Sequence, residues 1–355
     1  MILALRVLVG LAGALISVLT VLSAVRSVVL PRAVPARIAA TVFAVMKVLF
    51  NARLRRVSSY EARDRVMASY APLSLLGMLL TWLLAVYVGF VGIFWALHDS
   101  WHDAVELSGS SLLTLGFDRP PTLLGELASF AEAAIGLVLL ALLITFLPSL
   151  YGTFSRREAA VAKLEVRAGR PPSGVELLER AWAIQRFDML PDLWSSWEDW
   201  FIDLAETHTS LPALPYFRSP TADQSWVTAA GALLDAASLH VSIVEGPPDV
   251  DAQLTLRAGY LALRRLCVFF ALPFPEKPAP TDPISIRRTE FDDAWQRLEA
   301  AGLPLRADKE QAWLDFAGWR VNYDIPLLSL ATLTMAPYAP WSSDRSLTTT
   351  HVRRS

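Results

Sequence analysis

A short run at residues 111–118 contains the residue types in this chain that could do chemistry. It combines a hydroxyl at Thr114, a glycine at Gly116 and a carboxylate at Asp118, and it lies between two long apolar segments. Non-helical backbone is tolerated at membrane depth only where protein buries it or where it lines a water-filled path. Backbone carbonyls on such a path can replace the hydration shell of an ion. The run therefore predicts an ion selectivity filter.

The segment that carries this run is acidic. Its single basic residue is Arg119, and its carboxylates are Asp99, Asp103, Glu106, Asp118 and Glu126. Acidic groups near a mouth concentrate cations and steer them inward. We expect Asp118 to stand at the mouth of the path; the alternative is an ordinary solvated loop.

Two elements must position the run. Residues 101–113 can form a short helix, with Ser111 among the small residues that allow close packing near its end. The carbonyls at the C-terminus of such a helix favour a cation. In the apolar segment that follows, Glu132 is costly to place in lipid, so it either contacts the short helix or filter from behind or bonds a neighbouring backbone group near the interface. Pro148 near the end of that segment can kink a helix and would suit a gate.

Three short patterns occur in register along residues 114–136. Residues 114–118 read Thr-Leu-Gly-Phe-Asp, residues 120–125 read Pro-Pro-Thr-Leu-Leu-Gly, and Gly136 follows eleven residues later. Together they resemble the pore-loop potassium-channel family, specifically its bacterial two-span pore module. That family has a Thr-Val-Gly-Tyr-Gly-Asp filter, often a Pro-x-Thr-Leu-x-Gly approach to its inner helix, and a hinge glycine within that helix. The resemblance covers about residues 73–152.

The resemblance implies roles for individual residues and an assembly. Thr114, Leu115 and Gly116 would build the inner ion sites, Phe117 would brace the filter wall, and Asp118 would form a ring at the outer mouth. Gly136 would be the hinge, although small residues also allow close helix packing. The second filter glycine is missing, so we expect a cation preference, potassium first, without strict selectivity. A central pore needs several copies of the chain, and the family implies a homotetramer.

The bulk composition predicts a membrane protein. The chain is 54% hydrophobic with a mean hydropathy of +0.39. Residues 3–30, 73–97 and 127–150 each reach the roughly 20 apolar residues that cross a bilayer. A signal peptide is the alternative for the first, although no clear cleavage site follows it. Residues 38–54 are shorter and charged, and they predict an amphipathic helix at the interface.

Basic residues in the short loops predict the orientation. Residues 31–71 hold many of them: Arg32, Arg37, Lys47, Arg53, Arg55, Arg56, Arg63 and Arg65. The segment after the third span opens with Arg156, Arg157 and Lys163, whereas the loop between the second and third spans has Arg119 alone. We therefore expect the N-terminus outside the plasma (bacterial inner) membrane and the C-terminal part in the cytoplasm.

We expect an all-α fold in three parts: residues 1–72 with the first span and the basic interfacial helix, residues 73–152 as the pore module, and residues 153–355 as a cytoplasmic helical domain. Helix-spaced apolar residues occur over 174–187, 193–207, 225–244, 251–272, 287–301 and 309–323. A stripe of aromatic residues at 194–201 indicates a core face or a face packed on the membrane surface.

No enzymatic signature is present in this domain. Neither a glycine-rich dinucleotide turn nor a phosphate loop occurs. Glu206 and His208 stand two apart and would point in different directions on a helix. His98 and His102 have the spacing of a helical metal pair, but two ligands do not make a site.

The net charge of −2 shows no nucleic-acid footprint, and the single cysteine, Cys267, excludes an intrachain disulfide.

The leading hypothesis is thus a cation channel with no cofactor, whose cytoplasmic domain assembles or gates it in response to an unidentified regulator. The alternative is a non-conducting membrane sensor or scaffold that retains channel architecture. A membrane-bound enzyme comes third, because no acid–base or metal constellation supports it.

Overall fold

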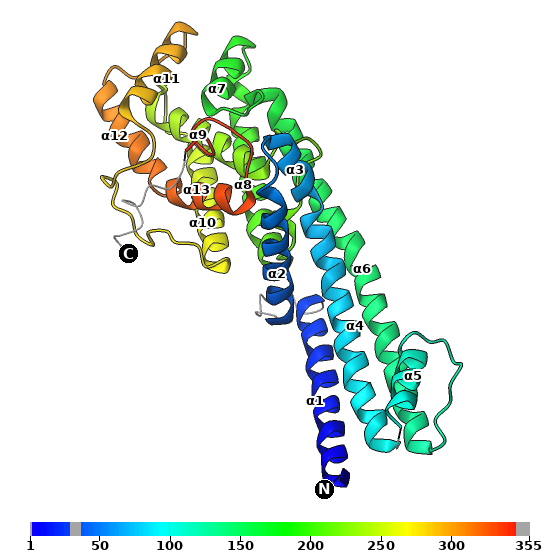
Figure 1. Ribbon diagram of the computed structural model, residues 1–355. Coiled ribbons are helices and arrows are strands. Elements are labelled where there is room, and N and C mark those ends of the chain that lie inside the picture. The colour runs from blue at the N-terminus through cyan, green and yellow to red at the C-terminus, as the bar shows by residue number, and fades with distance from the viewer. Residues whose placement is uncertain (1, 29–36, 99, 346–355) are drawn as a thin grey trace. The chain divides into compact units, whose positions relative to one another are not determined.

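A computed structural model describes residues 2–28, 37–98 and 100–345 of the chain. These residues are all-helical, with no strand among them (Figure 1). They divide into two compact units, residues 1–152 and residues 153–355. The long helix α6 contributes to both units. The end of the first expected span, at residues 29–30, lies outside the described residues, as do Arg32 and Asp99.

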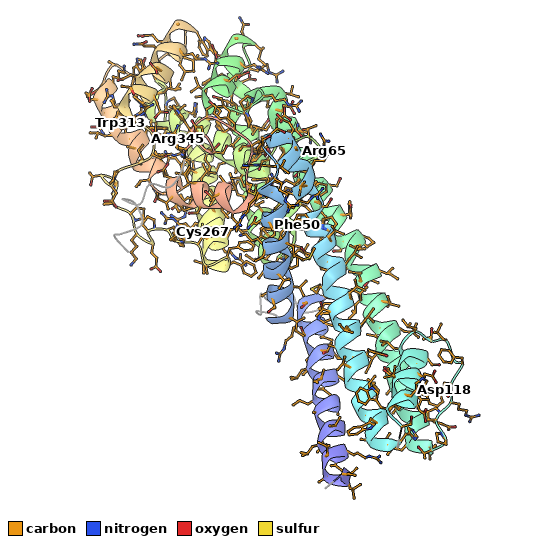
Figure 2. The ribbon with its side chains drawn as sticks, in the orientation of Figure 1. Phe50, Arg65, Asp118, Cys267, Trp313 and Arg345 are labelled. Atoms are coloured by element: carbon orange, nitrogen blue, oxygen red, sulfur yellow. The ribbon has the colours of Figure 1, made fainter. Side chains whose placement is uncertain are left out.

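The first unit is built from apolar helices that run alongside one another (Figure 1). Its helices are α1 (Ile2–Val28), α2 (Arg37–Leu54), α3 (Tyr60–Ala68), α4 (Tyr70–Leu97), α5 (Trp101–Leu112) and the first part of α6 (Leu123–Ala168). Figure 2 labels Phe50 on α2, whose ring meets that of Tyr70 at the start of α4, 5.5 Å between centroids. The Tyr70 hydroxyl also donates to the Phe43 carbonyl at 3.0 Å, so α2 is held to α4 by both kinds of contact.

Small residues bring α1 and α4 into close contact. A Cβ atom on Gly13 would lie 2.2 Å from the Gly89 carbonyl oxygen, and one on Gly89 would lie 2.3 Å from the Ser17 hydroxyl. Both distances are too short for a real side chain, so the two backbones approach each other only because these positions are glycine. Close approach through small residues is how helices associate in lipid, where apolar burial gives little advantage.

Four helical stretches are long and apolar enough to cross a membrane: α1, Tyr60–Leu97, α6 and α9 (Trp226–Ile243). The buried share of their most apolar windows separates them: 11% in α1, 44% in Tyr60–Leu97 and 28% in α6, but 89% in α9. Because protein already encloses α9, we interpret it as the core helix of the second unit. The other three expose aliphatic side chains that water would solvate poorly, which is compatible with a membrane protein.

The second unit packs its helices around α9. They are the end of α6, α7 (Gly174–Ala183), α8 (Leu190–Ser210), α9, α10 (Val250–Phe269), α11 (Arg288–Ala300), α12 (Lys309–Arg320) and α13 (Asp324–Thr334). The aromatic stripe of α8 faces this core: Trp194 and Phe201 are fully buried, and Trp197 and Trp200 nearly so. The expectation of a core face is therefore confirmed. Cys267 is also buried, and its burial raises the thiol pKa to about 12.

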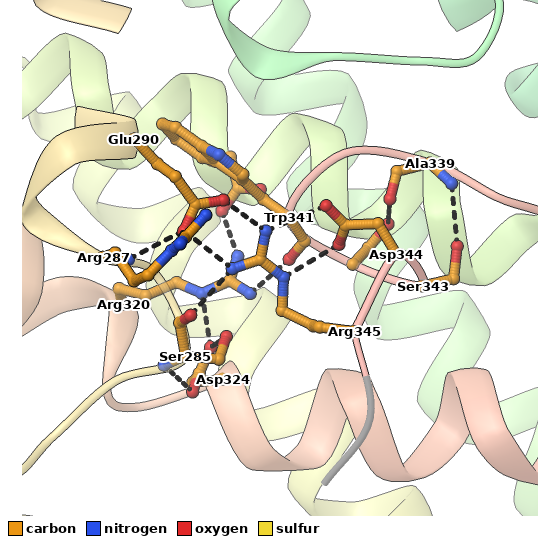
Figure 3. A network of polar contacts seen from close by, with 12 residues as sticks. Ser285, Arg287, Glu290, Arg320, Asp324, Ala339, Trp341, Ser343, Asp344 and Arg345 are labelled. Atoms are coloured by element: carbon orange, nitrogen blue, oxygen red, sulfur yellow. Dashed lines mark hydrogen bonds and ion pairs between the residues drawn. The ribbon is translucent and has the colours of Figure 1, made fainter. Parts of the chain in front are cut away.

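A buried polar network ties the last helices of this unit together (Figure 3). The fully buried Arg320 donates to Asp324 at 2.8 Å, to the Trp341 carbonyl at 2.5 Å and to Asp235. Asp324 also accepts from the amide and hydroxyl of Ser285, at 2.8 and 2.6 Å. Each buried charge thus has several hydrogen-bond partners, which buried charges need.

The helices differ from the expected ones in three places. The helix that carries the third apolar segment, 127–150, begins earlier, at Leu123, and continues through Pro148 to Ala168. The expected helix 174–187 stops at Ala183, and a 3₁₀ turn, Phe187–Met189, leads into α8. α3 and α13 were not expected, since each is short and has no clear apolar periodicity in the sequence.

Candidate functional site

Helix α5 precedes the candidate filter and begins and ends with defined caps. At its start the Ser100 hydroxyl accepts from the Asp103 amide at 3.3 Å, and a carboxylate in the first turn complements the helix dipole. At its end the Leu115 amide bonds the Ser110 carbonyl at 2.8 Å while Thr114 adopts φ = 55°. This is the left-handed closing turn that glycine usually makes. The expected helix 101–113 is confirmed to within one residue.

A buried carboxyl on α6 holds α5 from the side. The Ser108 hydroxyl lies 2.5 Å from Glu132 Oε1 and 3.2 Å from the Tyr87 carbonyl oxygen of α4. Glu132 is fully buried, and its second oxygen has no hydrogen-bond partner among the described residues. Of the two alternatives for Glu132, the structure places it against α5. Ser108 therefore joins three helices through one hydroxyl.

Gly136 lies where the end of α5 meets α6. A Cβ atom built on Gly136 would stand 2.6 Å from the Leu112 carbonyl oxygen and 3.1 Å from the Leu112 side chain. The glycine is required by this close approach. Of the two roles considered for Gly136, close helix packing explains by its contacts why a glycine stands at this position.

The contacts of α5 with Gly136 of α6 and Tyr87 of α4 show how far α5 extends along these two helices. Gly136 is thirteen residues into α6, or about 20 Å at 1.5 Å per residue. Tyr87 is ten residues from the end of α4, or about 15 Å. The C-terminal end of α5 thus lies well inside the lengths of α4 and α6 rather than beyond their ends.

The candidate filter follows this turn and is exposed on the single chain. Leu113, Leu115 and Phe117 expose 61%, 60% and 66% of their surface, respectively. The Ser110 hydroxyl accepts from the amides of Phe117 and Asp118 at 3.1 and 3.3 Å, which folds the segment back onto α5. Gly116 takes φ = 68°, a conformation that favours glycine.

Asp118 lies on the loop between α5 and α6 (Figure 2) and is half-buried. Its carboxylate accepts from the Arg119 amide at 2.9 Å. The Arg119 side chain pairs with Glu126 at 2.7 Å, so Glu126 is partly neutralised instead of adding a free charge. Thr122 directly precedes α6, and its hydroxyl accepts from the Gly125 amide at 3.2 Å. The residues 120–125 therefore form the entry to α6.

The members of each pair considered for metal or acid–base chemistry lie on different elements or at different depths. His98 is the C-cap that follows α4, whereas His102 lies on α5 and faces Glu106 at 3.7 Å. Glu206 pairs with Arg265 at the surface, at 3.0 Å, while His208 is buried. No group of three or more metal-ligating side chains occurs among the described residues.

His208 belongs instead to a buried cluster within the second unit. Arg157 approaches its Nε2 at 3.2 Å and donates to the Leu214 and Phe217 carbonyls at 3.0 and 2.8 Å. Burial, and then the Arg157 charge, holds the pKa of His208 well below its usual value. The neutral imidazole can therefore accept from the guanidinium.

The sequence marks Ser108 and Ser110, like Ser111, as small residues that allow close packing, but it did not predict their hydrogen bonds or the contact with Tyr87. Their partners lie up to 24 residues away, and serine has no periodic signal by which to find it. The one available signal was the position of Ser108 on the face of the short helix that meets Glu132, which could have suggested the hydrogen bond between these two residues. No family model, curated protein or solved structure matches this chain.

Proposed function

We propose that the chain is the subunit of a homotetrameric cation channel of the plasma membrane. The segment 114–118 would line the ion path, with potassium as the first candidate ion and no strict selectivity. α4 and α6 would span the bilayer around α5 as a re-entrant helix, and α1 would be a further span. The N-terminus would lie outside and the second unit in the cytoplasm.

The depth of α5 is the observation that carries this proposal. Its end meets α6 at Gly136, about 20 Å from the start of that helix, and Ser108, one turn earlier, meets α4 about 15 Å from the end of that helix. Both places lie near the middle of a roughly 30 Å hydrocarbon core if α4 and α6 span it. Backbone there must be enclosed by protein or line water. The carbonyls at the end of α5 and the filter backbone supply the oxygen atoms that a dehydrated cation needs.

Exposure of the filter side chains supports assembly. Exposure of the apolar side chains of Leu113, Leu115 and Phe117 to water would be unfavourable, and the single chain leaves them uncovered. Further copies around an axis would bury them and close a path between four filters. Closed cyclic symmetry is the common form of such assemblies.

Flux from liposomes tests the proposal directly. Reconstituted protein should release potassium, and sodium or calcium measured beside it reports selectivity. Thr114→Ala should change the potassium-to-sodium ratio because it removes the hydroxyl, whereas Thr114→Ser retains the hydroxyl and should change it less. A folded tetramer without cation flux in several lipid mixtures would refute conduction and favour the non-conducting scaffold.

The role of Asp118 has its own control. Asp118→Asn removes one charge per subunit and should lower conductance, more so in dilute salt, because the screening length is about 10 Å at 0.1 M and about 30 Å at 0.01 M. Asp251→Asn makes the same charge change at an exposed position in the second unit and should leave conductance unchanged. If both substitutions lower conductance equally, or if the effect of Asp118→Asn does not depend on salt, then Asp118 does not lie on the ion path.

A further inference from the structure

One groove in the second unit has an apolar floor and a basic rim. It encloses about 770 Å³ between the end of α6, α7 and the start of α8. Leu164, Leu177, Leu190 and Trp197 line it and are buried. At its edge Val166 and Ile184 remain 71% and 62% exposed. The groove therefore offers apolar surface that the single chain leaves uncovered.

The charged residues around this groove are almost all basic. They are Arg156, Lys163, Arg167, Arg180 and Arg186, against Asp192 as the one acidic lining residue. Three of them, at positions 156, 163 and 167, recur at helical spacing and share one face of α6. The face of α6 that meets the groove is thus positively charged over about 17 Å.

Most of this charge is not neutralised by the protein. Arg180 is paired with Glu176, and Arg186 lies 3.6 Å from Asp188. Within residues 2–28, 37–98 and 100–345, Arg167 donates to the Lys163 carbonyl alone, at 3.1 Å, and Arg156 to the Thr153 hydroxyl alone, at 3.5 Å. Within the described residues, no carboxylate pairs with Arg156, Lys163 or Arg167. Elsewhere in the unit an exposed arginine does find a carboxylate, as Arg265 does with Glu206 at 3.0 Å.

We infer that this groove binds an anionic phospholipid, with its phosphate on the α6 cations and part of an acyl chain on the apolar floor. A free phosphate would not cover Val166 and Ile184, and a neutral amphiphile would not compensate the cations. α6 also carries the apolar stretch 127–150, so Arg156 stands about 9 Å along the helix beyond residue 150. Basic clusters directly beyond a membrane span attract anionic lipids. The inference needs α6 to cross the membrane but does not depend on ion conduction.

Short-chain lipids test the inference on the full-length protein in neutral detergent. Dihexanoyl phosphatidylglycerol, below its micelle concentration, should bind in calorimetry and raise the unfolding temperature. Dihexanoyl phosphatidylcholine and inorganic phosphate, at the same concentrations, should do neither. Lys163→Gln/Arg167→Gln should weaken phosphatidylglycerol binding at least about tenfold, since each basic residue near an anionic lipid contributes measurably to affinity.

A matched control separates the groove from net charge. Arg257→Gln/Lys277→Gln makes the same charge change at exposed positions outside the groove and should leave binding unchanged. Ile184→Glu is a second groove variant; its side chain is exposed, so the fold should tolerate it while lipid affinity falls. Equal binding of phosphatidylcholine would indicate an apolar surface only, and equal binding of phosphate would indicate a phosphate site. Either result, or undiminished binding by both groove variants, would overturn the inference.

Discussion

The close contact of Gly136 with α5 makes a sharp prediction for Gly136→Ala. The added Cβ would stand 2.6 Å from the Leu112 carbonyl oxygen, whereas ordinary contact begins at 3.4 Å. The end of α5 and α6 must therefore separate by about 0.8 Å, or the helix must distort. Overpacking of this size costs about 1–3 kcal/mol.

Helix propensity acts in the opposite direction and must be separated from the steric effect. Replacing glycine by alanine inside a helix is worth about 0.5–1 kcal/mol in favour of the variant. Gly152 provides the control, because it lies in the same helix and a Cβ there meets nothing within 4 Å. Gly152→Ala should therefore show the propensity gain alone, and the difference between the two variants should equal the steric cost of about 1–3 kcal/mol.

Unfolding of both variants in the same detergent, by denaturant titration or thermal melting, measures this difference. Flux measurements on the same preparations add the functional outcome: displacement of α5 should change ion selectivity in Gly136→Ala and leave it unchanged in Gly152→Ala. If Gly136→Ala is as stable as Gly152→Ala, the packing argument is wrong. A change in opening with selectivity and stability intact would instead support a hinge at Gly136.

Three further predictions concern single contacts. Gly89→Ala should destabilise the first unit by about 1–3 kcal/mol by forcing α1 off α4, while Gly77→Ala, whose Cβ would lie 3.5 Å from Val42, should not; equal melting temperatures would contradict this. The lowered pKa of His208 means that the unfolded chain takes up a proton below about pH 6.5 before the folded chain does, so stability falls as the pH falls, by up to about 1.4 kcal/mol per unit. His208→Gln, which can still accept from Arg157, should flatten this slope in urea titrations at successive pH values. Arg320→Met should cost about 3–5 kcal/mol because it leaves buried carboxylates unpaired, and Arg320→Lys less because it keeps the charge; urea unfolding compares the two, and equal losses would argue against the charge.

The fold class followed from the sequence because the apolar stretches are long and uninterrupted. A 27-residue apolar helix such as α1 has few alternatives to a membrane span, and the strong periodicity of α8, α9 and α10 located the helices of the second unit. Boundaries were less accurate where the sequence changes from apolar to charged without a break. α6 shows this: the expected span ends at residue 150, yet the charged residues that follow it remain helical because lysine, arginine, glutamate and alanine are all strong helix formers.

The candidate site was only partly predictable. Thr114, Gly116 and Asp118 stood out because their residue types are unusual between apolar segments. The residues that hold them did not, because Ser108 and Ser110 act through contacts with Glu132 and the amides of residues 117 and 118. The ion pair of Arg119 with Glu126 also lowers the expected negative charge of this segment. The sequence presents Glu126 as one of several free carboxylates, whereas Arg119 neutralises it in part. Hydrogen bonds of this kind depend on the three-dimensional approach of helices, which a single sequence does not specify.

α6 carries a buried ionisable residue with fixed partners in each unit. Glu132 meets Ser108 in the first, and Arg157 meets two backbone carbonyls and Glu158 in the second. A shift of α6 by one residue would rotate its side chains by about 100° and take both from their partners. Sliding or rotation of α6 at either place would therefore break these contacts. Pro148 lies between the two residues and removes one helical hydrogen bond, so a bend in α6 costs least there.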